Sequence, residues 1–133
     1  MSLDKTKLNI AVLSIYSFPI GGAATNRILS YCKGLVENDV NVDVFIPHTT
    51  DYLPVKDTLP DSGSYEGISY FYSSGRYRSK YKVIRGLATK TKFRQYYGYI
   101  TSWESICEQS KIKKYSCIII STDLIPSLFI YSL

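Results

Sequence analysis

The fold is decided by the stretch Leu8-Asn9-Ile10-Ala11-Val12-Leu13-Ser14-Ile15-Tyr16-Ser17-Phe18-Pro19-Ile20-Gly21-Gly22-Ala23-Ala24. Its first seven residues form an apolar run with β-branched side chains, which is typical of a strand covered on both faces of a parallel sheet. Pro19 excludes Phe18 from helical geometry, and Gly21 and Gly22 can adopt positive φ and bring backbone N–H groups close to a ligand. We therefore expect a buried strand followed by a loop that can receive an anion.

An amphipathic helix and a second strand follow this loop. The apolar positions recur at i, i+1, i+4, i+7 and i+8, which is one stripe of a helix, and they are Ile28, Leu29, Cys32, Leu35 and Val36. The helix is expected to end near Asn38-Asp39, and residues 40–46 form an apolar strand that Pro47 ends. This βαβ unit implies a right-handed crossover.

The remaining elements are read more coarsely. Residues 48–67 are rich in Pro, Asp, Thr and Ser and indicate a long surface loop, whereas residues 68–72 are aromatic and favour a third strand. A second amphipathic helix is predicted from Thr91 to about Ser110, and residues 117–121 form a fourth strand. The apolar stripe of that helix is Phe93, Tyr96, Tyr97, Ile100, Trp103 and Cys107. The predicted fold class is α/β, a Rossmann-like three-layer sandwich with a mainly parallel sheet of about four strands.

Length and composition restrict the class of protein. The 133 residues are 45% hydrophobic and 20% charged, which suits a single domain with one modest core. The three cysteines, Cys32, Cys107 and Cys117, lie within apolar patterns, so we expect buried thiols in a reducing compartment and neither a disulfide nor a zinc site. No signal peptide and no run of about 18 apolar residues appears, which predicts a soluble, cytoplasmic protein. As a separate expectation, the chain holds neither a metal nor a cofactor.

The carboxyl-terminal residues resemble an unfinished βα unit. Pro126 suits the first turn of a helix, but only residues 127–133 remain to form it, and they include the bare apolar side chains of Phe129, Ile130, Tyr131 and Leu133. We therefore expect residues 1–133 to be a truncated or isolated amino-terminal domain whose exposed apolar surface favours self-association.

Positive charge is concentrated in one segment. Residues 76–114 contain eleven Lys and Arg against Glu104 and Glu108, a net charge of +9, whereas the whole chain carries +5 and the remainder therefore −4. The residues predicted to contact an anionic membrane or acceptor are Arg76, Arg78, Lys80, Lys82 and Arg85. Interleaved tyrosines suit a lipid headgroup layer, and the same composition can bind nucleic acid. The alternative is an ordinary solvated basic surface.

Candidate site residues follow from the rule that ligands of open α/β sheets bind beyond the carboxyl ends of the strands. Residues 14–17, His48 and residues 121–123 should share this edge. His48 has no second histidine near it in the sequence and reads as a loop residue, not as a metal ligand. Asp123 can either accept a proton from an acceptor hydroxyl or cap a helix. Gly21 and Gly22 form either a ligand-binding loop or a tight turn.

Two segments resemble a known family, the group 1 glycosyltransferases with the two-domain glycosyltransferase-B fold. Residues 18–27, Phe-Pro-Ile-Gly-Gly-Ala-Ala-Thr-Asn-Arg, followed by a helix with Lys33-Gly34-Leu35 and a strand, are similar to the start of that family's amino-terminal domain. Residues 117–129 are similar to its fourth strand and the turn after it, and the middle of the chain is not similar. Asn38-Asp39 stands where that family often has a glycine.

The resemblance implies an acceptor-side domain of an enzyme that transfers a sugar from a nucleotide-sugar donor to a glycan or lipid-linked acceptor, as in cell-envelope polysaccharide biosynthesis. Gly21, Gly22, Ala23, Arg27, His48 and Ser121 would bind substrate or phosphate, and Asp123 would be catalytic. Arg27 can also be an ordinary surface residue. Such enzymes often work at the inner face of the membrane, and the donor nucleotide belongs mostly to a carboxyl-terminal domain, so this chain would be inactive alone.

Other classes of protein fit less well. The G-x-G-x-x-G fingerprint, the G-x-x-x-x-G-K-[ST] loop and the G-x-S-x-G elbow are absent, which disfavours dehydrogenases, ATPases and hydrolases of those types. The alternative is a small Rossmann-like binding module with a basic surface for an anionic membrane or nucleic acid. A receiver module would need paired acidic residues after the first strand, where Ser14-Ile15-Tyr16 stands.

Overall fold

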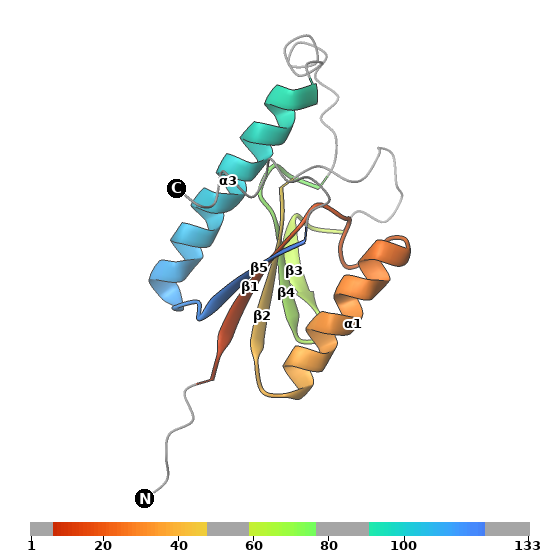
Figure 1. Cartoon of the computed structure of the whole chain (residues 1–133), viewed down its shortest axis with the longest axis vertical. Helices are drawn as coiled ribbons and strands as arrows, with labels where there is room; N and C mark the ends of the chain where they lie inside the picture. Colours follow the sequence, from red (N-terminus) through yellow and green to blue (C-terminus); the bar gives the residue numbers. More distant parts are fainter. Residues whose placement is uncertain (1–6, 48–58, 77–90, 122–133) are drawn as a thin grey trace, which may run out of the picture.

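In the part of the chain that the structure describes, the fold is α/β, with a five-stranded, mostly parallel sheet and two helices (Figure 1). The computed structural model describes residues 7–47, 59–76 and 91–121, with the backbone alone for 91–97. The elements in chain order are β1 (Asn9–Ser14), α1 (Ala23–Glu37), β2 (Asn41–Ile46), β3 (Ser62–Tyr65), β4 (Ile68–Tyr72), α3 (Thr91–Ile112) and β5 (Cys117–Ser121). The strand order is β3-β4-β2-β1-β5, and only β3 is antiparallel to its neighbour.

The register brings the carboxyl ends of the four parallel strands to one edge of the sheet. Val12 of β1 pairs with Val44 of β2 on one side and with Ile119 of β5 on the other. Ser14 and Ser121 are register partners at the ends of β1 and β5. The prediction that these two serines share one edge is therefore confirmed.

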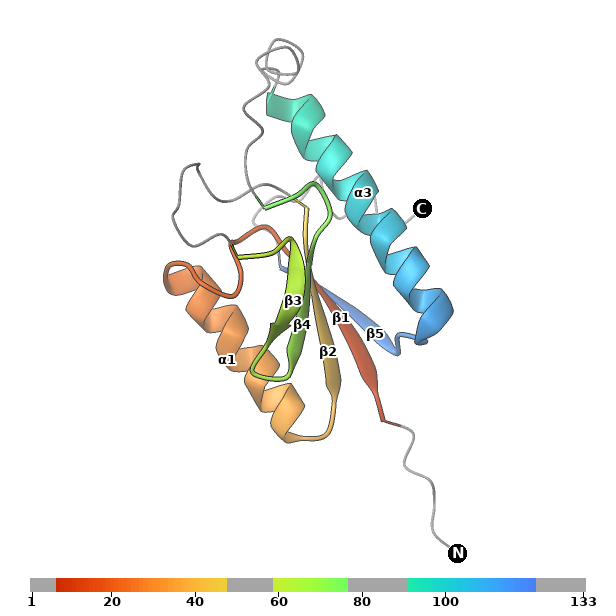
Figure 2. The ribbon, with the colours of Figure 1, turned by 180° about the vertical axis from the view of Figure 1, so that it is seen from behind.

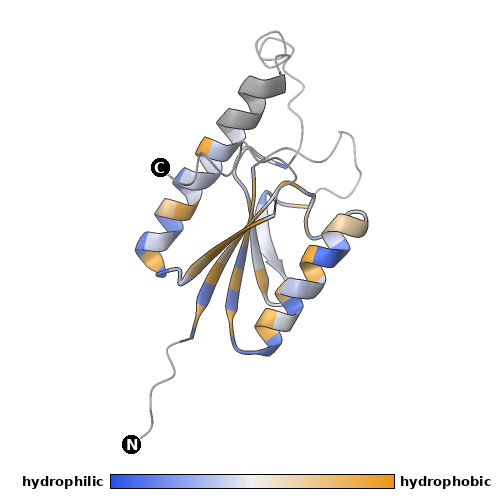
Figure 3. Ribbon diagram, viewed as in Figure 1, coloured by the Kyte–Doolittle hydropathy of each residue, from blue (hydrophilic) through white to orange (hydrophobic). Residues whose placement is uncertain are grey.

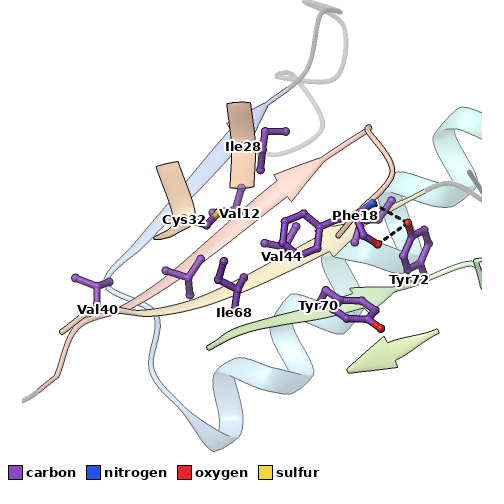
Figure 4. Close-up of a cluster of buried hydrophobic side chains, with 11 residues drawn as sticks. Val12, Phe18, Ile28, Cys32, Val40, Val44, Ile68, Tyr70 and Tyr72 are labelled. Carbon is purple, nitrogen blue, oxygen red and sulfur yellow. Dashed lines mark hydrogen bonds between the residues drawn. The ribbon is translucent and has the colours of Figure 1, made fainter. Parts of the chain in front are cut away.

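One face of the sheet packs against α1. Alternate residues of the central strands, among them Val12, Val44 and Ile68, form a cluster with Ile28 and Cys32 of α1 (Figure 4). The partly buried Leu29, Leu35 and Val36 pack against the same cluster, which confirms the stripe predicted from the sequence. The helix ends where predicted, with Asn38 as its C-cap and Asp39 in the left-handed region at φ 62°.

The other side chains of β1 face α3. Ala11 and Leu13 cluster with Phe45, Tyr99 and Ile106. Figures 1 and 2 show α1 and α3 on opposite sides of the sheet in both views, and Figure 3 shows apolar residues concentrated in the middle strands.

The predicted buried stripe of α3 is wrong where its side chains are described. Ile100 is 50% exposed and Trp103 is 39% exposed, whereas the buried side chains are those of Tyr99, Ser102 and Ile106. The Ser102 hydroxyl donates to Ser73 Oγ at 2.9 Å, so a polar contact with the segment after β4 selects the buried face of this helix. Apolar periodicity alone does not report such a contact. The side chains of Phe93, Tyr96 and Tyr97 lie outside the described part.

The segment predicted as a loop contains β3, so the sheet has one strand more than the four expected. The β3–β4 hairpin turns at Glu66 and Gly67, whose φ values of 52° and 79° match the left-handed residues of a two-residue hairpin turn. Gly63 leaves room for the ring of Tyr70, because a Cβ there would lie 2.9 Å from the Tyr70 hydroxyl oxygen. Hydrophobic patterning did not predict this edge strand, because its Ser-Gly-Ser sequence is polar.

The cysteines differ in burial. Cys32 is buried against the sheet, and burial raises the pKa of its thiol to about 11. Cys107 and Cys117 are exposed, so the prediction of three buried thiols is wrong for these two. Cys107 lies on the outer side of α3, and Cys117 begins the edge strand β5. Within the described ranges, no helix is long and apolar enough to span a membrane.

Candidate functional site

The loop between β1 and α1 is held by buried polar contacts. Phe18 is 1% exposed, and its ring lies 6.0 Å from that of Tyr70, centroid to centroid. The Tyr72 hydroxyl accepts a hydrogen bond from the Phe18 N–H and lies at the same 2.9 Å from the Phe18 carbonyl oxygen, to which it can donate (Figure 4). Arg76 Nη1 donates to that carbonyl oxygen at 3.0 Å. The start of the loop is therefore fixed to β4 and the residues after it.

Arg76 is not a residue of an exposed basic patch, which corrects the prediction made from the charge pattern. It is 2% exposed, and its guanidinium carbon lies 5.1 Å from the ring centroid of Tyr72. Its backbone N–H donates to Asp61 Oδ1 at 2.7 Å. A buried arginine needs such partners. The other members of the predicted patch, Arg78, Lys80, Lys82 and Arg85, lie outside the described residues.

Gly21 and Gly22 are both exposed, but neither adopts the positive φ expected from the sequence. The glycines with positive φ in the described ranges are Gly67 and Gly75, and Gly22 has φ −86°. Gly21 is required for packing instead, because a Cβ there would collide with the side chains of Ser17 and Thr25. A Cβ on Gly22 would meet nothing within 4 Å, so this backbone is open to an incoming group.

The amino-terminal end of α1 lacks a side-chain cap. Gly22 is the N-cap in an extended conformation, and no side chain makes a capping hydrogen bond. The Thr25 hydroxyl donates to the Ser17 carbonyl oxygen at 2.6 Å instead of capping the helix. The first turn contains no acidic residue, so nothing within it offsets the positive end of the helix dipole. An uncapped helix start with exposed Gly22 and Ala23 can accept an anion.

A groove of about 780 Å³ runs beside α1, between this helix and the sheet. Its floor includes Val12 of β1 and Ile119 of β5, and Arg27 and Ser121 both line it. Two predicted site residues that are far apart in the sequence thus meet at one groove. Gly21, Gly22 and Ala23 precede the part of α1 that forms its wall.

The groove lies where the order of the strands in the sheet reverses. After β1, the chain passes through α1 and adds β2 on one side of β1. After α3, which packs on the opposite face, the chain adds β5 on the other side of β1. In open α/β sheets, such a point leaves a crevice at the carboxyl ends of the two strands, where ligands bind. Here those strands are β1 and β5.

Not every predicted site residue can be placed. His48 and Asp123 lie outside the described residues. In the part of the chain that the structure describes, no group of three His, Cys, Asp or Glu side chains is arranged to hold a metal ion.

Sequence reasoning missed Tyr72 and Arg76 as the residues that hold the loop. The strand pattern of residues 68–72 placed Tyr72 correctly in β4, but it carried no signal for contact with Phe18. Arg76 looked like the first member of a basic run.

Comparison with known proteins adds no information about the function of this site. No protein-family model, curated protein or solved structure matches this chain.

Proposed function

We propose that this chain is the acceptor-side domain of a sugar-nucleotide-dependent glycosyltransferase, a Rossmann-like three-layer sandwich that forms half of a glycosyltransferase-B fold. One observation carries the proposal. The exposed, uncapped start of α1 follows a diglycine at the carboxyl end of β1, beside a groove that Arg27 and Ser121 share. The resemblance of residues 18–27 to the group 1 enzymes supplies the reaction.

The chemistry requires stabilisation of a departing diphosphate. Negative charge builds on that leaving group as the glycosidic bond breaks, and preorganised N–H donors stabilise it without reorganisation. In this proposal the amides of Gly22 and Ala23 donate to the phosphate oxygens, and the Arg27 guanidinium supplies the opposite charge. The absence of an acidic side chain from the first turn of α1 favours this role.

Other parts of the machinery are assigned by resemblance. His48 and Ser121 would contact substrate, and Asp123 would accept the proton of the acceptor hydroxyl. The donor nucleotide would be bound mainly by a second domain, so this chain alone is expected to release no sugar from a sugar nucleotide. The enzyme would act in the cytoplasm at the inner face of the membrane, where residues 78–85 could contact anionic lipid.

The experiment measures binding of inorganic diphosphate by calorimetry to the wild-type chain and to Ala23→Pro. Proline is tolerated at the first helical position, and the extended Gly22 before it is compatible with proline. This variant thus removes one N–H donor and leaves the helix intact. We expect binding to weaken by at least about ten-fold, since a hydrogen bond to a charged group contributes about 1.5–3 kcal/mol and about 1.4 kcal/mol is a factor of ten. Ala23→Ser, which retains the N–H, is the matched control.

Equal affinity of Ala23→Pro and wild type would contradict the proposal, because the diphosphate would then bind elsewhere, for example to the basic segment. Turnover of a sugar nucleotide by the purified chain would contradict the need for a second domain.

A further inference from the structure

Among the described residues that line the groove beside α1, the one charged side chain lies at one end, and the rest are largely apolar apart from Ser30, Asn38 and Ser121. At the end near the start of α1, the groove is lined by Arg27, Ser121 and Tyr16. Farther along, it is lined by Ile28, Cys32 and Leu35 of the helix and by Val12 and Ile119 of the sheet. From Arg27 to Asn38 the helix rises about 16 Å at 1.5 Å per residue. The groove therefore offers an elongated surface with distinct ends.

The polar end carries one uncompensated charge. Arg27 is the only ionisable acid or base, other than tyrosine and cysteine, among the described residues that line the groove, and no carboxylate lines it. No ion pair of Arg27 is formed within the described ranges. The positive end of the α1 dipole lies one turn away, at Gly22 and Ala23. An apolar occupant that covered this end would have to desolvate the guanidinium without a partner, which is unfavourable.

The apolar part of the groove exposes side chains that are normally covered. Ile119 is 43% exposed and Tyr31, on the wall of the groove, is 67% exposed. Contiguous apolar surface of this kind marks a binding site for an apolar group. A cavity of about 780 Å³ is within the usual range for small-molecule sites.

We infer that this groove binds a long-chain lipid phosphate, with the phosphate beside Arg27 and Ser121 and the hydrocarbon along the half-buried Leu35 and the exposed Ile119. Charge complementarity selects an anionic head, and the graded lining selects a single chain attached to it. The inference rests on the proposed function only where it identifies this ligand as the acceptor. A lipid-linked acceptor held in this way would present its phosphorylated end at the edge of the sheet where the sugar is transferred.

The test uses dodecyl phosphate below its micelle concentration, with residue-resolved amide shifts of the full chain as the readout. We expect shifts along α1 and β5. Dodecyl maltoside supplies the same chain without the anion, and inorganic phosphate supplies the anion without the chain. Both should bind at least ten-fold more weakly than dodecyl phosphate, because each makes only half of the contacts.

Two variants test the charged end and the apolar part of the groove separately. Arg27→Gln should weaken dodecyl phosphate binding about ten-fold and leave dodecyl maltoside unchanged. Gly34→Trp should weaken binding of both detergents, because Gly34 lines the groove and a Cβ there meets nothing within 4 Å. This change fills the groove without entering the core, and it improves helix propensity. Lys111→Gln, on α3, is the matched charge control and should have no effect.

Several results would overturn the inference. Equal binding of the phosphate and the maltoside would mean an apolar surface without selection for an anion, and equal binding by wild type and Arg27→Gln would mean the same. Shifts confined to residues outside α1 and β5 would place the ligand elsewhere. Shifts of the groove residues on dilution alone would identify a second copy of the chain as the occupant. Diphosphate binding that depends on the Ala23 amide would survive each of these results, so failure of this inference is distinguishable from failure of the proposed function.

Discussion

The two faces of the sheet are built from alternate residues of the same strands, but their buried polar groups hold different ends of it. On the α1 face, Tyr72 and Arg76 bind the backbone of Phe18 at the carboxyl edge. On the α3 face, buried Asp43 accepts a hydrogen bond from the Tyr115 hydroxyl and pairs with Lys113, ahead of β5. The first network positions the loop between β1 and α1, which can contact a ligand. The second network holds the segment between α3 and β5 against β2. The proposed chemistry therefore depends on one face and one edge of the sheet.

The largest expected effects come from the two buried phenylalanines. Phe18 and Phe45 are both almost fully buried, one in each cluster, so Phe18→Ala and Phe45→Ala should each lower the free energy of unfolding by about 3–5 kcal/mol. Diphosphate affinity of the folded fraction should fall only for Phe18→Ala, because only Phe18 anchors the loop. Urea unfolding and calorimetry measure the two quantities. Equal loss of affinity in both variants would remove the distinction between the faces.

A smaller effect is expected for Arg76→Met, which keeps much of the side-chain volume and loses the hydrogen bond to the Phe18 carbonyl. The variant should be less stable by about 1.5–3 kcal/mol, the range for a hydrogen bond to a charged group. Hydrogen exchange of the Thr25 and Asn26 amides should accelerate if Arg76 holds the loop against the start of α1. Unchanged exchange with lowered stability would show that Arg76 acts only in the core. Lys114→Met, at an exposed position on the other side of the molecule, is the control.

The α3 face should show its own dependence on pH. Burial, followed by the hydrogen bond to Asp43 and the charge of that carboxylate, raises the pKa of Tyr115 above its ordinary value of 10.0. The neutral phenol is thus favoured in the folded state, and its contribution to stability is complete below pH 10 and lost as the pH rises beyond that value. Tyr115→Phe should cost about 1 kcal/mol at pH 7, and the difference from wild type should shrink above pH 10.

Urea titrations at several pH values measure this difference, with Tyr31→Phe at an exposed position as the control. A constant difference between wild type and Tyr115→Phe from pH 7 to pH 11 would contradict the role assigned to the hydrogen bond with Asp43.

The sequence predicted well those features that depend on local patterns. The run from Leu8 to Ser14, the stripe of α1 and the strand at residues 68–72 each produced the expected element, because apolar periodicity reports burial directly. The stripe of α3 failed, because Ser102 contacts Ser73 and turns a more polar side of the helix inward. The strand β3 was missed, because its polar residues lie at the edge of the sheet, where little apolar surface is buried.

The candidate site was predictable only in part. A diglycine between a strand and a helix located the loop, but the reason for Gly21 is a tertiary contact with Ser17 and Thr25 and not its φ. The positive charge of Arg76 suggested solvent, whereas the fold uses it to bind a carbonyl oxygen nearly sixty residues earlier in the chain. Contacts over such separations leave no periodic signal in the sequence.

In the proposed function, the start of α1 presents its amides to a phosphate at the carboxyl edge of the sheet. A titration of the ¹⁵N-labelled chain with inorganic diphosphate, followed residue by residue by NMR, measures whether these amides bind the anion. We predict that the largest amide shifts occur at Gly22, Ala23 and Ala24, and that the Arg27 side-chain resonance moves with the same affinity. Shifts confined to Lys111, Lys114 and the rest of the basic segment, with the amides of Gly22 and Ala23 unchanged, would contradict the claim.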